Sequence, residues 1–93
     1  MRYQVRWNKS VDKRLSQVPS YIRDKFIAWV LVVERVGVTQ ARQLKGYHDE
    51  PLKGERLGQR SIRLNRAYRA IYLERSDREI CIVEVIEVSK HDY

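Results

Sequence analysis

The sequence predicts an α+β domain in which a helical hairpin packs on one face of a small, mainly antiparallel sheet, in the order β-α-α-β-β-β. Three observations support this prediction. Apolar and polar residues alternate at 2–7, apolar residues recur with helical spacing over 11–36, and three strand-like runs follow residue 58. The chain has 93 residues, enough for one core and without a repeat or linker-like tract, so we expect a single domain spanning 1–93.

The first half of the chain divides into a strand and two helices. The alternation in "RYQVRW" (2–7) predicts a strand. Ser10 is the expected N-cap of a short amphipathic helix, and Pro19 suits the start of a second one. Gly37 is well placed as the residue that ends this second helix. The apolar stripe of the second helix consists of Ile22, Phe26, Trp29, Val30, Val33 and Val36.

Residues 45–58, "KGYHDEPLKGERLG", show neither the helical nor the strand period. Irregular segments of this length in a small domain tend to be functional or disordered. The preceding "TQARQL" (39–44) can add one helical turn. His48 is expected to be an ordinary loop residue, because no Cys/His spacing in the sequence indicates a metal site.

Three strand-like runs complete the chain. They are "QRSIRL" (59–64), "YRAIYLE" (68–74) and "EICIVEVIEV" (79–88). Short turns around Asn65 and around Ser76-Asp77 separate them, so antiparallel hairpins are the economical connection.

The first of these hairpins has two possible registers. With a three-residue loop at 65–67, Leu64 pairs with Tyr68 and Arg63 pairs with Arg69; a two-residue loop would place Arg63 beside Tyr68. We favour the three-residue loop, because it turns the apolar residues toward the helices and both arginines toward the open face. Like charges that face each other across a strand pair are destabilising. This register therefore suggests that an anion normally lies between the two arginines.

The charge of the chain favours a polyanionic partner. Its formal net charge is +7, and neutralising phosphates releases their condensed counterions. The excess is local, because residues 52–72 carry six basic side chains against one acid, Glu55. The six are Lys53, Arg56, Arg60, Arg63, Arg66 and Arg69.

The sequence also excludes several classes of protein. The longest apolar run, "FIAWVLVV" (26–33), is too short to span a bilayer. The N-terminal "MRYQVRWNKS" lacks the apolar stretch of a signal peptide. The single cysteine, Cys81, lies in an apolar strand pattern, which predicts a small core residue rather than a nucleophile or a disulfide partner. We therefore expect a cytoplasmic protein.

The stretch "EPLKGERLGQRSIRLNRAYRAIY" (50–72), taken with the element order, the size and the charge, resembles the RelE/ParE superfamily of toxins from type II toxin–antitoxin systems. Its "EPLKG…G..S.R", followed by "YR..Y", is similar to the RelE-, YoeB- and HigB-like mRNA interferases in particular. The layout resembles the family over nearly the whole chain, whereas the motifs are confined to 50–72 and the terminus. The resemblance implies a RelE-like fold, a cognate antitoxin, the mRNA and rRNA of the ribosome as partners, and no cofactor.

The resemblance also implies roles for individual residues. Glu50 matches the carboxylate that serves as a base, and Arg63 and Arg69 match basic residues of the second and third strands. His91 and Tyr93 resemble terminal groups that act as acid or base, and which of them transfers the proton stays open. We expect a further basic set to bind RNA, namely Lys53, Arg56, Arg60 and Lys90.

The implied chemistry is metal-independent cleavage of RNA on the ribosome, which stops translation. The 2′-hydroxyl attacks the adjacent phosphate while a base takes its proton, cations stabilise the developing charge and an acid protonates the 5′-oxygen. Arg63 and Arg69 suit the cationic role, because a guanidinium stays charged and binds phosphate oxygens in a fork.

The sequence leaves two other functions open. A ParE-like inhibitor of DNA gyrase needs a binding surface but no acid–base set, so Glu50, His91 and Tyr93 count against it. A simple RNA-binding module would bind RNA without cutting it.

Overall fold

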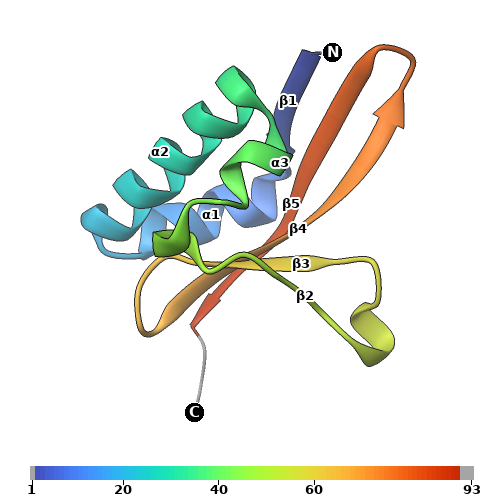
Figure 1. Cartoon of the computed structure of the whole chain (residues 1–93). Helices are drawn as coiled ribbons and strands as arrows, with labels where there is room; N and C mark the ends of the chain where they lie inside the picture. Colours follow the sequence, from blue (N-terminus) through green and yellow to red (C-terminus); the bar gives the residue numbers. More distant parts are fainter. Residues whose placement is uncertain (1, 91–93) are drawn as a thin grey trace.

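The computed structural model describes residues 2–90 and has the predicted α+β arrangement, with the helices on one face of a sheet (Figure 1). The helices are α1 (Lys9–Gln17), α2 (Ser20–Val36) and the short α3 (Val38–Ala41), with 3-10 turns η1 (Lys45–Tyr47) and η2 (Gly54–Arg56). The strands are β1 (Arg2–Trp7), β2 (Glu50–Pro51), β3 (Arg60–Arg63), β4 (Tyr68–Asp77) and β5 (Ile80–Lys90). Within this described part of the chain, no helix is long and apolar enough to cross a membrane.

The sheet has the strand order β1-β5-β4-β3-β2. β1 is parallel to β5, and the other neighbours are antiparallel, so the prediction of a mainly antiparallel sheet is confirmed. β2 was not expected. It has two residues, of which Glu50 pairs with Ser61 and Pro51 with Arg60. A strand this short shows no alternation, and its proline is tolerated because β2 lies at the sheet edge.

The helix boundaries differ from the prediction at one end. Asn8, and not Ser10, is the N-cap of α1, because its side-chain oxygen accepts a hydrogen bond of 2.9 Å from the backbone N–H of Val11. Either residue type can cap a helix, and the sequence alone does not separate them. Pro19 does begin α2, where its carbonyl accepts from the N–H of Ile22 at 3.0 Å.

Gly37 ends α2 as predicted, and the structure explains why it is glycine. Its φ of +93° lies in the region that side chains rarely adopt, and its N–H donates to the carbonyl of Val33. A Cβ here would lie 2.6 Å from the ring of Tyr3 in β1. The close approach of α2's end to β1 therefore requires a residue without a side chain.

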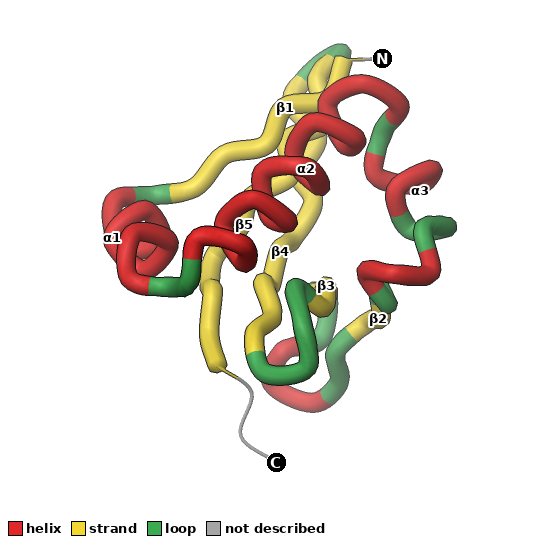
Figure 2. The backbone as a smooth tube through the Cα atoms, turned by 90° about the vertical axis from the view of Figure 1, so that its left-hand side faces the viewer, coloured by secondary structure: helices red, strands yellow, loops and turns green. Residues whose placement is uncertain are grey.

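The core lies between α1, α2 and the sheet. Figure 2 looks onto the helix-covered face, with α2 in front of β4 and β5. An aromatic row runs through the core, with ring centroids 5.2 Å apart for Trp7 and Phe26, 6.1 Å for Phe26 and Trp29, and 5.2 Å for Trp29 and Tyr72. Cys81 is buried in the core, as predicted. The predicted stripe of α2 is buried except for Val36, which is 49% exposed because α2 ends there.

The two hairpins of the sheet were predicted with different success. In the first, Arg63 pairs with Arg69 and the N–H of Leu64 donates to the carbonyl of Tyr68, so the three-residue loop is confirmed. In the second, β4 continues to Asp77 and Arg78 makes the turn with a left-handed φ of 56°. The predicted turn at Ser76-Asp77 is wrong by two residues.

Candidate functional site

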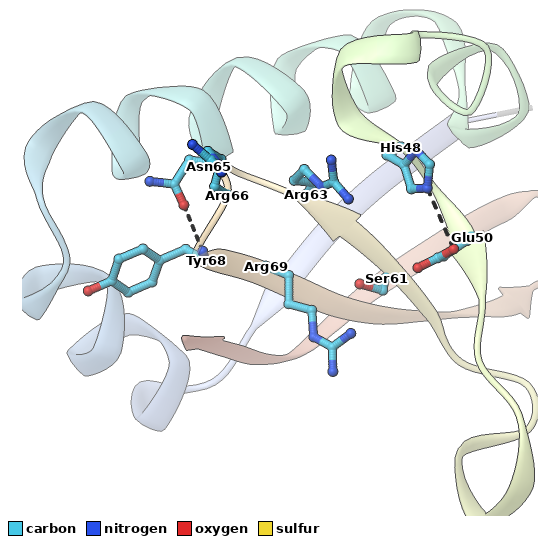
Figure 3. A pocket seen from close by; sticks show the side chains of 8 residues that line it. All are labelled: His48, Glu50, Ser61, Arg63, Asn65, Arg66, Tyr68 and Arg69. Carbon is cyan, nitrogen blue, oxygen red and sulfur yellow. Dashed lines mark hydrogen bonds and ion pairs between the residues drawn. The ribbon is translucent and has the colours of Figure 1, made fainter. Parts of the chain in front are cut away.

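A pocket lies over the open face of the sheet, at the end where β2, β3 and the β3–β4 turn meet (Figure 3). Both strands of the first hairpin and the segment before β2 contribute to it. Its lining consists of His48, Glu50, Ser61, Arg63, Asn65, Arg66, Tyr68 and Arg69. Three of the five residues predicted to be catalytic, Glu50, Arg63 and Arg69, are therefore brought together.

The β3–β4 turn fixes the distance between the two arginines. The side-chain oxygen of Asn65 accepts hydrogen bonds from the N–H groups of Ala67 and Tyr68, each at 2.7 Å, which closes the loop tightly. Arg63 and Arg69 are consequently direct cross-strand partners on one face. The sequence predicted Asn65 as a turn residue, and the structure shows that the two hydrogen bonds to its side chain stabilise the turn.

Arg63 and Arg69 form no ion pair within residues 2–90, although the charge of Arg69 acts on Glu87 of β5. No carboxylate in that range lies within ion-pair distance of Arg63 or Arg69. The Nε of Arg69 is buried without a hydrogen-bond partner there, and an unsatisfied buried donor is destabilising. Two guanidinium groups that line one pocket, with no ion-pair partner in the described range, form a site that favours a bound anion with several oxygens, such as a phosphate.

Glu50 brings a carboxylate to the edge of this cationic site. Its backbone pairs with Ser61 of β3, which fixes the position of the side chain. The Nε2 of His48 lies 3.7 Å from its Oε2, and Figure 3 shows the imidazole and the carboxylate turned toward each other. His48, which we had predicted to be an ordinary loop residue, therefore lines the pocket.

A buried carboxylate, Asp49, holds the segment that carries His48 and Glu50. The side chain of Asp49 is 1% exposed, and it accepts hydrogen bonds from Arg60 at 2.6 Å and from the hydroxyl of Tyr72 at 2.5 Å. Burial and the hydrogen bond to Asp49 raise the pKa of Tyr72 to about 12, so this hydroxyl stays a donor. The guanidinium of Arg42 joins the same network through Tyr72 and Glu74.

This network accounts for Arg60, which the sequence grouped with the RNA-binding residues. Arg60 faces the helix-covered side of the sheet and does not line the pocket. The hydrogen bond and charge of Asp49 outweigh burial, and the pKa of Arg60 is raised. Asp49 itself was missed, because it lies in a segment without periodicity and nothing in the sequence indicates that it is buried.

A second ion pair ties η2 to the open face. The Nη2 of Arg56 lies 2.5 Å from the Oε1 of Glu87 in β5, and Ser89 donates to the other oxygen at 2.9 Å. Burial acts to raise the pKa of Glu87, but these two hydrogen bonds and the charges of Arg56 and Arg69 lower it. Glu87 was not singled out from the sequence, since it continues the alternation of an ordinary strand.

The remaining predicted residues are placed as follows. Lys53 and Lys90 are exposed, outside the pocket lining. His91 and Tyr93 lie outside the described residues. In the described range 2–90, no group of three or more His, Cys, Asp or Glu side chains is arranged to hold a metal ion.

Comparisons with known proteins place the fold. No protein-family model and no curated protein sequence matches the chain. Among solved structures, it is similar to a YoeB/ParE toxin from Agrobacterium tumefaciens, with a TM-score of 0.74, 20% identity, and 96% of this chain and 99% of that chain covered. For the YoeB–YefM complex from Staphylococcus aureus the TM-score is 0.70 and the identity 17%, over 99% of this chain and 100% of that chain.

A third similar structure is the RelBE2 toxin–antitoxin complex from Mycobacterium tuberculosis, with a TM-score of 0.66, 24% identity, and coverage of 98% of this chain and 100% of that one. Each of these matches covers nearly all of this chain and nearly all of the similar chain. The chain thus shares the fold of these solved structures, which is the RelE-like fold that the resemblance implied.

Proposed function

We propose that this chain is the toxin of a toxin–antitoxin pair and that it cuts mRNA on the ribosome as a metal-independent endoribonuclease. The observation that carries the proposal is the cross-strand pair of Arg63 and Arg69, which shares one pocket with Glu50 and has no carboxylate partner within residues 2–90. The likeness of the fold to YoeB- and RelE-type toxins supports it.

In this proposal, the pocket supplies the groups that bind the phosphate and that act on the 2′-hydroxyl. Arg63 and Arg69 bind the scissile phosphate and stabilise the charge that develops on its oxygens, which is the largest contribution in this kind of catalysis. Glu50 supplies a carboxylate at the side of the attacking 2′-hydroxyl. Among the terminal residues, His91 or Tyr93 supplies the proton for the leaving 5′-oxygen in this proposal.

The surrounding basic residues take part in different ways. Arg66 lines the pocket, and Lys53 and Lys90 are exposed, so these three are available to neighbouring phosphates of mRNA or rRNA. Arg56 holds Glu87 and Arg60 holds Asp49, so we assign both to the support of the site rather than to RNA.

A cognate antitoxin is part of this proposal. Several of the similar structures are toxin–antitoxin complexes. A partner that carries a carboxylate or an acidic segment to the open face would neutralise Arg63 and Arg69, and so would prevent the toxin from binding RNA. The toxin would act in the cytoplasm, where translation takes place.

The test is an in vitro translation reaction in which cuts in the message are mapped by primer extension. The proposal expects cuts on translated messages only, with 2′,3′-cyclic phosphate ends. A message that stays intact while the protein inhibits translation, or DNA damage without RNA cleavage, would contradict it; the second result would favour a gyrase inhibitor of the ParE type.

A further inference from the structure

His48 lies in the pocket although neither the motifs nor the spacing of the sequence assigned it a role. Its imidazole and the carboxylate of Glu50 are 57% and 54% exposed, so RNA bound at the pocket can reach both. It is one of two histidines in the chain. The question is whether the structure holds it there or whether it lies there by chance.

The backbone on both sides of His48 is anchored. Before it, the hydroxyl of Tyr47 donates to the carbonyl of Lys25 at 3.1 Å, and the Lys25 ammonium lies 5.3 Å from the Tyr47 ring centre. After it, Asp49 is buried between Arg60 and Tyr72. Between these anchors, His48 adopts a left-handed conformation with φ of 45°. In a residue other than glycine this conformation is strained, and such strain clusters at functional sites.

The distance between His48 and Glu50 determines what the pair can do. The Nε2 of His48 and the Oε2 of Glu50 are 3.7 Å apart, which is too close for the two groups to lie on opposite sides of one phosphate. An in-line displacement needs its base and its acid on opposite sides of the phosphorus, so these two cannot be the base and the acid. They can act together as a base and the group that orients it, and such contacts are often long before substrate binds.

We propose that His48 is the base of the cleavage reaction and that Glu50 orients it, so that the pair takes the proton of the 2′-hydroxyl. This inference rests on the proposed function and deepens it. Glu50 favours the tautomer with its proton on Nε2, which leaves Nδ1 to accept the proton of the 2′-hydroxyl. The 2′-oxygen then bonds to phosphorus, the bond from phosphorus to the 5′-oxygen breaks, and the 5′-oxygen takes a proton from water or from the acid at the other end. The resulting imidazolium is stabilised by the Glu50 carboxylate.

The experiment is removal and chemical rescue of the imidazole. The variant His48→Gly suits the left-handed backbone, so it should fold at least as well as the wild type while leaving a space for free imidazole. Lys45→Gly, in the same segment but outside the pocket, is the matched control. Cleavage of a translated message is measured for both variants, the wild type and Glu50→Gln, with and without added imidazole.

We expect His48→Gly to lose about 10²–10⁴-fold in cleavage rate and to regain part of it with imidazole. Lys45→Gly should cut like the wild type, and Glu50→Gln should lose less than His48→Gly. The inference is overturned if His48→Gly keeps the wild-type rate, if imidazole has no effect on it, or if Glu50→Gln is the more damaged variant. Each of these results leaves the wild type active, whereas a wild type that cuts nothing would overturn the proposed function and this inference with it.

Discussion

Arg60 and Arg63 lie in the same short strand, β3, but their guanidinium groups have opposite surroundings. Arg60 is 25% exposed and its Nε lies 2.6 Å from the buried carboxylate of Asp49. Arg63 is exposed, faces Arg69, and has no carboxylate within ion-pair distance in the range 2–90. The two residues are an odd number of positions apart, so they point to opposite faces of the sheet.

The different surroundings of Arg60 and Arg63 show that an arginine can have two roles in a small basic protein. On the helix-covered face, a carboxylate inside the protein neutralises the arginine, and the pair supports the fold. On the open face, Arg63 and Arg69 have no ion-pair partner within residues 2–90, and we expect a bound anion to relieve the repulsion between them. A count of basic residues in the sequence does not distinguish these two roles. The face of the sheet to which each residue of β3 points does distinguish them.

Removal of Asp49 should have the largest effect on the fold. Asp49→Ala leaves Arg60 and the Tyr72 hydroxyl without their shared partner, and breaking a buried pair in this way costs about 3–5 kcal/mol. The change in the free energy of unfolding can be measured by urea denaturation followed through the fluorescence of Trp29, whose ring centre lies 5.2 Å from that of Tyr72. Arg63→Gln is the control from the opposite face. A loss below about 1 kcal/mol for Asp49→Ala would show that the pair does not support the fold.

Tyr72→Phe should have a smaller effect that depends on pH. At neutral pH the variant loses the hydrogen bond to Asp49, at a cost of about 1–3 kcal/mol. The pKa of Tyr72 is raised from 10.0 to about 12, so the wild type keeps this contribution below pH 10 and loses it as the pH rises toward 12. The difference in unfolding free energy between the two proteins should therefore shrink above pH 10. A difference that stays constant up to pH 12 would contradict the buried position of the hydroxyl.

Glu87→Gln should have the smallest effect. The pair of Arg56 and Glu87 is 42% and 37% exposed, and solvent screens it, so its loss should cost about 0.2–1 kcal/mol at neutral pH. The pKa of Glu87 is lowered from its ordinary value of 4.5, so the contribution is present above that value and is lost as the pH falls below it. Wild type and variant should become equally stable in acid, as thermal unfolding at a series of pH values can show.

The sequence was sufficient for the parts of the fold that depend on periodicity. The strand at 2–7, the helix ended by Gly37 and the register that pairs Arg63 with Arg69 all follow from the alternation of apolar residues and from the chemistry of turns. Register was predictable because a shift by one residue would have exposed the apolar side chains of the hairpin.

The sequence was not sufficient for the segment 45–58. The strand β2, the burial of Asp49 and the position of His48 depend on contacts with residues far away in the chain, such as Ser61 and Tyr72. Local patterns carry no information about such contacts. The resemblance to a toxin family did indicate Glu50, Arg63 and Arg69, and the structure brings these three into one pocket.

A comparison of Arg69→Gln with Arg60→Gln, for cleavage of a translated message and for the free energy of unfolding, tests whether the reaction takes place on the open face. We predict that Arg69→Gln lowers cleavage about 10²–10³-fold and leaves the fold as stable as before or slightly more stable. Arg60→Gln should destabilise the fold but cut normally at a temperature at which it stays folded. The opposite result, with cleavage kept in folded Arg69→Gln and lost in folded Arg60→Gln, would contradict the assignment of the reaction to the open face.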